Sequence, residues 1–191
     1  MDHAAYVRVL LSVWVGLGLG QLIQAFNRLA RYKGRVDWDW LPLTWAALAL
    51  LMFVQTWWAY FVILQSPVWA NLFAFFLPLC VFIILFLICA SALPDVTKTA
   101  EGSTVDLRTF YFGQHRYFFG LWAALMVLAL VVSFVTRGHL RMSVDAFRAV
   151  ALIAAIGLAV SSNRLLHTVV TLASLAALIT YIVLFSLRLG I

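Results

Sequence analysis

Charged residues are scarce in this sequence, and that scarcity indicates the kind of environment, water or lipid, that surrounds the folded chain. Only 10% of the 191 residues are charged and 65% are hydrophobic, with a mean hydropathy of +1.04. Ordinary globular domains carry about 25% charged residues, and a soluble fold of this size cannot bury so much apolar surface. The composition therefore predicts an integral membrane protein. The net charge of +6 does not indicate nucleic-acid binding, because the basic residues flank apolar segments.

Ionisable residues are missing from the apolar segments, which argues against several functions. No Asp or Glu lies within them, and both lysines, Lys33 and Lys98, lie in predicted loops. Ion-coupled transport usually requires an ionisable group within the membrane, and a retinal Schiff base requires a buried lysine. The GxSG, HExxH and paired-glutamate patterns of membrane enzymes are also missing. We therefore predict a non-catalytic protein.

Cysteine is nearly absent as well. Cys80 and Cys89 are the only two, and they lie nine residues apart in one apolar segment, on opposite faces of a helix. They form neither a disulfide framework nor a zinc motif. No metal site is predicted from cysteine.

The apolar segments predict an all-α fold, a single domain over residues 1–191 that consists of a bundle of six transmembrane helices. The expected helices are residues 4–31, 41–64, 68–93, 104–136, 144–161 and 164–188. The S-x-x-D spacing of Ser103 and Asp106 predicts that the fourth begins near Thr104. That helix would be about 50 Å long against a hydrocarbon core of about 30 Å, so it should extend beyond the bilayer. Gly16 and Gly20 have the GxxxG spacing of a close helix contact.

Three polar stripes occur at helix ends that six antiparallel spans place on one side of the membrane. Each stripe follows one helix face, with its members three or four residues apart. Together they predict a polar vestibule, formed by Gln21, Gln24, Arg28, Arg108, Tyr111, His115, Arg164 and His167. Within it, Arg108 and His115 should meet the stripe of the first helix at Gln24 or Arg28. The alternative is that each helix end is polar only because it meets lipid headgroups.

Two histidines share this level, which raises a cofactor alternative. His115 and His167 could ligate haem or a metal ion. The sequence contains neither a haem-attachment motif nor the further ligands of a metal site. We therefore expect no cofactor and keep the histidine pair as the alternative.

The distribution of basic residues predicts the orientation. The side that carries both termini has five, Arg8, Arg137, Arg141, Arg148 and Arg188. The other side has eight, Arg28, Arg31, Lys33, Arg35, Lys98, Arg108, Arg116 and Arg164. Cytoplasmic loops are enriched in Lys and Arg, so both termini are expected outside.

Several short motifs resemble a widespread bacterial family of uncharacterised six-span integral membrane proteins. They are HAAYVRVLLSVWVGLGLGQLI at residues 3–23, VQTWW at 54–58, DLR at 106–108 with Tyr111, RYFFG at 116–120, and SNR at 162–164 with His167. The resemblance implies a location in the bacterial inner membrane. It supplies no activity and no catalytic residue.

Two functions follow as expectations. The first is a non-catalytic membrane subunit, a homo-oligomer or part of a larger complex, that binds lipid, pigment or protein. Aromatic outer faces and the GxxxG spacing favour it. The second is a passive channel or carrier that passes a small solute through the vestibule.

Overall fold

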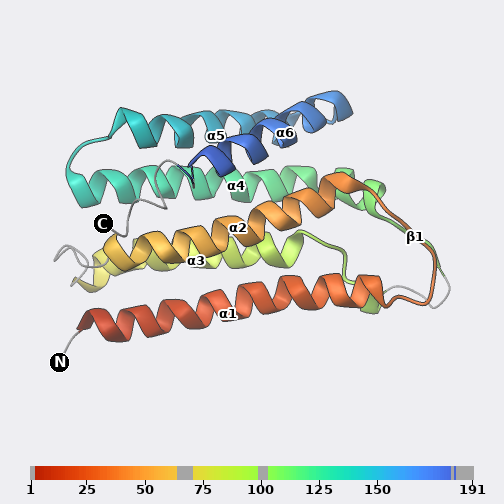
Figure 1. The fold of residues 1–191 in the computed structure, drawn as a ribbon, viewed down its shortest axis with the longest axis horizontal. Helices are drawn as coiled ribbons and strands as arrows, with labels where there is room; N and C mark the ends of the chain where they lie inside the picture. The colour runs from red at the N-terminus through yellow and green to blue at the C-terminus, as the bar shows by residue number, and fades with distance from the viewer. Residues whose placement is uncertain (1–2, 64–70, 99–102, 182, 184–191) are drawn as a thin grey trace.

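Apart from one very short strand pair, the regular elements among the described residues are all helices (Figure 1), which confirms the all-α prediction. The computed structural model describes residues 3–63, 71–98, 103–181 and 183. Its helices are α1 (His3–Ala30), α2 (Trp40–Ile63), α3 (Leu72–Ser91), α4 (Leu107–Arg137), α5 (Met142–Val160) and α6 (Arg164–Tyr181), with a 3₁₀ turn η2 (Val96–Lys98). The predicted start of the third helix at residue 68 and the predicted end of the sixth at residue 188 lie outside the described residues.

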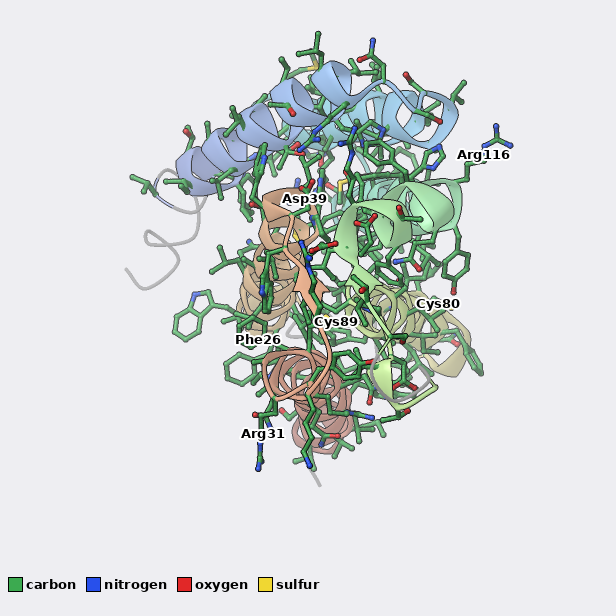
Figure 2. All side chains as sticks on the ribbon, turned by 90° about the vertical axis from the view of Figure 1, so that its right-hand side faces the viewer. Phe26, Arg31, Asp39, Cys80, Cys89 and Arg116 are labelled. Atoms are coloured by element: carbon green, nitrogen blue, oxygen red, sulfur yellow. The ribbon has the colours of Figure 1, made fainter. Side chains whose placement is uncertain are left out.

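Successive helices run in opposite directions along the bundle (Figure 1). The α1–α2, α3–α4 and α5–α6 connections therefore lie at one end, called the β end here because β1 and β2 lie there, and α1 begins at the other. Viewed from the β end, α1 lies at the bottom, α2, α3 and α4 lie in the middle, and α5 and α6 lie at the top (Figure 2). The end of α1 and the starts of α4 and α6 thus share one level, but α1 is on the far side of the bundle from α6.

Four of the described helical segments are long and apolar enough to cross a membrane: Val9–Ala30, Trp40–Tyr60, Leu107–Arg137 and Arg164–Tyr181. Phe75–Ser91 in α3 forms a shorter apolar helix, which continues through Pro78. The outer faces are strongly apolar. On α6, Leu165, Val169 and Leu172 are between 55% and 75% exposed. Such faces require an apolar solvent around the bundle.

Two loops are joined at the β end by a pair of strands that the sequence did not predict. β1 (Val36–Asp37) pairs in parallel with β2 (Val105–Asp106), so that Val36 lies opposite Val105. The Tyr32 hydroxyl adds a hydrogen bond of 3.1 Å to the carbonyl of Ser103. This pairing holds the segment before α4 extended.

The extended segment changes where α4 begins. Its N-cap is Asp106, whose carboxylate accepts hydrogen bonds from the backbone N–H groups of Arg108 and Thr109, so α4 begins at Leu107, three residues after the predicted start near Thr104. A hydrogen bond of 2.6 Å from the Thr109 hydroxyl is the main cause of a lowered Asp106 pKa. The cap therefore contributes stability above the ordinary aspartate pKa, and that contribution is lost as the pH falls through the lowered value. α4 ends at Gly138, which has a left-handed φ of 73°.

α1 packs closely against α2 at Gly18, between the two glycines of the predicted GxxxG contact. A methyl group on Gly18 would lie 2.9 Å from Cζ of Phe53 and closer still to Cε2. The Phe53 ring is fully buried and packs against Phe82 of α3 at 5.9 Å between ring centroids. Among the described residues, nothing lies within 4 Å of a methyl group on Gly16 or Gly20. Within the bundle, the close contact is therefore made at Gly18 and not at the two glycines of the GxxxG spacing.

Gly18→Ala is expected to lower the stability of the bundle by about 1–3 kcal/mol, because the buried Phe53 ring must shift to admit the methyl group. Thermal denaturation in detergent micelles measures the effect, with Gly16→Ala as the matched control. Equal melting temperatures for the two variants would contradict the contact.

Candidate functional site

The polar residues of α4 and α6 form a cluster centred on His167, which is fully buried. Its Nδ1 lies 2.8 Å from the hydroxyl of Tyr111, and its Nε2 lies 2.7 Å from the carbonyl oxygen of Ser161. A carbonyl oxygen only accepts, so Nε2 carries the proton and, in the neutral ring, Nδ1 accepts from the Tyr111 hydroxyl. Both ring nitrogens are thus satisfied by the protein.

α2 joins this cluster through a tryptophan. The indole Nε1–H of Trp45 donates to the hydroxyl of Thr171 at 2.9 Å. Thr171 in turn donates to the backbone carbonyl of His167, one turn earlier in α6, at 2.6 Å. Trp45 also packs edge-to-face on Phe119 of α4, with ring centroids 4.8 Å apart. One aromatic side chain therefore contacts both other helices.

An ion pair closes the β end of the cluster. Asp39 accepts a hydrogen bond from the backbone N–H of Leu41 with one carboxylate oxygen, and the other lies 3.0 Å from the guanidinium of Arg164. Asp39 is only 8% exposed and lies between α2 and α6 (Figure 2). The same carboxylate therefore caps the start of α2 and holds the start of α6.

His115 lies beside His167, with ring centroids 5.9 Å apart. Its Nδ1 is 2.6 Å from the carbonyl of Phe112, so Nδ1 carries the proton, and Nε2 is 3.4 Å from the Ser162 hydroxyl. His115 thus faces α6 and the loop before it. The expected contact of His115 with the first helix was wrong.

The structure divides the eight predicted vestibule residues into two groups. Tyr111, His115, Arg164 and His167 come together as described. Gln21, Gln24 and Arg28 lie on α1, away from that group, and Arg28 contacts Gln24 at 3.4 Å and Asp95 at 3.7 Å. Arg108 is exposed, and the described contacts of Arg28 are with Gln24 and Asp95, so the predicted contact of Arg108 with α1 is not observed among the described residues. The residues of α1 therefore lie at the same depth as those of α4 and α6 but do not face them.

The haem or metal alternative has to be weighed against these hydrogen bonds. A ligand bond from His167 would displace Tyr111 from Nδ1 or the Ser161 carbonyl from Nε2. Within the described residues, no group of three or more His, Cys, Asp or Glu side chains could hold a metal ion. The alternative remains a prediction.

The space for a ligand lies elsewhere, in a cavity of about 200 Å³ between α2, α4, α5 and α6. None of the eight predicted vestibule residues lines it. It exists because large side chains of α2 and α4 face small ones on α5 and α6. The small ones are Ala151, Ala154, Ala155, Ser174 and Ala177. Its wall is apolar along most of its length, so it suits a hydrocarbon ligand.

Trp122 gives this apolar wall one polar atom that lacks a partner. The residue is 7% exposed, lines the cavity and packs on Trp45 with ring centroids 5.3 Å apart. Within the described part of the chain, its indole Nε1 has no hydrogen-bond partner. A buried donor of this kind costs about 1–3 kcal/mol when it is left unpaired.

Charge gathers at the end of the cavity far from the strands. Arg137 of α4 and Arg148 of α5 line it there, together with Ser133. Both guanidiniums contact Asp145, which is 4% exposed and also accepts hydrogen bonds from the Ser133 hydroxyl and the Arg141 backbone. Two cations thus face one anion.

Sequence reasoning did not identify these cavity residues. Arg137 and Arg148 were used only to predict the orientation, and Trp122 fell in a uniformly apolar stretch without a distinguishing signal. The alternation of small residues on α5 and α6 was the one available sign, because small side chains at helical spacing leave room between helices.

Comparison with known proteins gives no further assignment. No protein-family model, no curated protein and no solved structure matches the chain. The resemblance to six-span bacterial membrane proteins therefore remains a prediction.

The hydrogen bond between Tyr111 and His167 can be tested by removing one hydroxyl. Tyr111→Phe leaves Nδ1 of a buried histidine without a donor, so we expect a loss of about 1–3 kcal/mol in stability. Tyr117→Phe, on the same helix but 55% exposed, is the control. Chemical denaturation in mixed micelles compares them, and an unchanged midpoint for Tyr111→Phe would exclude a stabilising role of this bond.

Proposed function

We propose that all six helices cross a bacterial inner membrane as one domain. Support for adding α5 comes from its outer face, where Val150, Ile153 and Val160 are 66% to 74% exposed. Its 19 residues make about 28 Å of helix, close to a hydrocarbon core of about 30 Å. α4, with 31 residues and about 46 Å, would extend beyond the bilayer.

The same proposal places both termini outside the cytoplasm. The eight basic residues near the β end outnumber the five at the opposite end, and cytoplasmic loops carry the excess of Lys and Arg. The β end would then face the cytoplasm.

Cysteine labelling tests this orientation at two exposed sites. In a background with Cys80→Ala and Cys89→Ala, Lys33→Cys marks the β end and His139→Cys marks the opposite end. An impermeant maleimide added to intact cells should label His139→Cys, and should label Lys33→Cys only after the membrane is opened. The reverse pattern would invert the topology.

For the function, we propose a non-catalytic membrane protein that binds a lipidic molecule in the cavity between α2, α4, α5 and α6. The observation that carries this proposal is a mainly apolar cavity of about 200 Å³ between these four helices. Lipid binding was expected at the aromatic outer faces; the cavity provides an interior site. Assembly into a homo-oligomer or a larger complex remains a prediction.

The passive channel is the less favoured candidate. The polar groups expected to line its vestibule donate and accept among themselves, as Tyr111, His167 and Ser161 do. The cavity wall is mainly apolar, which disfavours a path for a hydrated solute.

A photoactivatable long-chain alcohol in proteoliposomes tests lipid binding. Cross-links should map by mass spectrometry to the cavity walls on α2, α4, α5 and α6. Ala154→Leu, which places a larger side chain in the cavity, should reduce the labelling by about fivefold or more, because the volume for the chain is lost.

Ala149→Leu is the control, since Ala149 is exposed on the same helix and is not part of the cavity wall. Labelling confined to outer faces in all variants would refute the interior site. Glycerol flux into the same liposomes should equal that of protein-free liposomes, and a faster flux would support the channel instead.

A further inference from the structure

The cavity between α2, α4, α5 and α6 has two ends of different chemistry. α2 and α4 run in the same direction, away from the β end (Figure 1), and Trp45 of α2 packs on Trp122 of α4 with ring centroids 5.3 Å apart. Tyr60 and Arg137 each lie 15 positions further along these helices, which is about 22 Å. They therefore share a level, at the end of the cavity far from the strands.

The end at Trp45 is apolar. The Trp45 indole N–H already donates to Thr171, and the indole nitrogen of Trp122 is enclosed by protein. Leu48 is the next residue of α2 in the wall, and Ser174 of α6 supplies the one aliphatic hydroxyl toward this end of the described wall. A helical serine can return its hydrogen bond to the carbonyl one turn earlier, so this end suits a hydrocarbon tail.

The opposite end is polar on all four helices. Its polar lining residues include Gln55, Thr56, Tyr60, Thr136, Arg137, Arg148 and Tyr181. Tyr60 is only 5% exposed, and its hydroxyl makes no hydrogen bond with the described residues. Unlike the Trp122 nitrogen, this hydroxyl is not enclosed by protein. It is therefore available to the polar head of a ligand.

The charge at this end favours an anionic head. Arg137 and Arg148 face the single carboxylate of Asp145, which leaves a local charge of +1. The side chains of the two arginines are only 29% and 19% exposed, and Arg148 is close enough to Tyr60 to act on it electrostatically. Each guanidinium has five N–H donors, and the described contacts with Asp145 use the NH1 atom of each arginine. Donors therefore remain for a second anion.

The volume favours a single acyl chain. A cavity of about 150 Å³ holds a benzene molecule, and pockets for drug-sized ligands occupy about 300–1,000 Å³. The present cavity has a volume of about 200 Å³ and extends from Trp45 to Arg137. A narrow space of this length suits one extended chain and not two side by side.

The position of the donors favours a phosphodiester over a carboxylate. A carboxylate has two oxygens in one plane, which suit one guanidinium fork. Here Tyr60, Arg137 and Arg148 come from three different helices around the cavity. The oxygens of a phosphodiester are arranged tetrahedrally, so different oxygens can face different helices. Its one negative charge matches the surplus of +1, whereas a phosphate monoester carries about −1.5 to −2.

We propose that the cavity binds a lipid with one acyl chain and a phosphodiester head of net charge −1. The phosphate binds Arg137, Arg148 and the Tyr60 hydroxyl, and the acyl tail extends toward Trp45. This inference rests on the proposed function, because it names the class and the direction of the lipidic molecule in the cavity.

Three competitors with the same acyl chain test the head in the purified full-length protein. Stearoyl lysophosphatidylglycerol, stearic acid at an alkaline pH that ionises it, and monostearoylglycerol are each titrated against a photoactivatable lysophosphatidylglycerol. The lysophospholipid should compete at least about tenfold better than the neutral monoacylglycerol, a factor that corresponds to about 1.4 kcal/mol. It should compete about threefold or more better than stearic acid, because its oxygens also reach Tyr60.

Matched variants assign these gains to residues. Arg148→Gln should remove the advantage of the lysophospholipid over the monoacylglycerol. Tyr60→Phe keeps the ring that packs on Phe82 and should remove only the advantage over stearic acid. The controls are Arg116→Gln, whose side chain points away from α4 (Figure 2), and Tyr117→Phe, which is 55% exposed. If Arg148→Gln fails to fold, Arg137→Gln replaces it, because the Arg137–Asp145 contact is the longer one at 3.7 Å.

The position of the photoreactive group tests the direction of the lipid. A diazirine at the end of the acyl chain should cross-link near Trp45 and Trp122, and one beside the head should cross-link near Tyr60 and Arg137. The reverse pattern would overturn the assigned direction.

The remaining outcomes separate this inference from the proposed function. Equal competition by the lysophospholipid and the monoacylglycerol, with cross-links in the cavity, would overturn the anionic head and leave lipid binding in place. Stearic acid that competes as well as the lysophospholipid would overturn the phosphodiester. No cross-link in the cavity with any probe would overturn the proposed function as well.

Discussion

The hydrogen bonds that converge on His167 fix the position of α6, and much of the remaining architecture depends on them. A helix with an apolar outer face gains little from contact with other apolar helices when lipid surrounds it. Polar contacts therefore have to specify its place, and here Tyr111 and Thr171 connect His167 to α4 and, through Trp45, to α2. Because these donors and acceptors satisfy one another, the cluster stabilises the bundle without leaving a group for a solute.

The cavity follows from the same arrangement. α6 is anchored near its start, and further along it presents Ser174 and Ala177 to α2 and α4, with Ala154 of α5 beside them. Side chains this small cannot fill the space opposite Trp122, so the bundle retains a cavity that a soluble core would have closed. At the far end, Asp145 holds the arginines in place by partial neutralisation. The hydrogen bonds that anchor the start of α6 and the cavity further along the bundle therefore result from the same helix arrangement.

The sequence predicted the helices well and their facing sides poorly. Long apolar runs between charged or glycine- and proline-containing segments define helices in any environment, so the predicted bounds that fall within the described residues were close to those observed. The depth of each residue along the membrane normal could also be predicted from the sequence. Depth does not specify which neighbouring helix a side chain faces. Gln24 and His115 share a level and face different neighbours. Asp39 pairs with Arg164 of α6, and Asp145 pairs with Arg137 of α4. Helical periodicity does not predict such contacts between helices.

The strand pair at the β end sets an order of events during synthesis. Val36 and Val105 are partners, and they lie 69 positions apart in the sequence. At a synthesis rate of about 5–20 residues per second, the second strand emerges roughly 3–14 seconds after the first. During that interval α1 has left the ribosome while the loop after it has no strand to pair with. The α1–α2 hairpin must therefore be stabilised by its own contacts, such as Gly18 against Phe53, until the loop that contains β2 has been synthesised and can pair with β1.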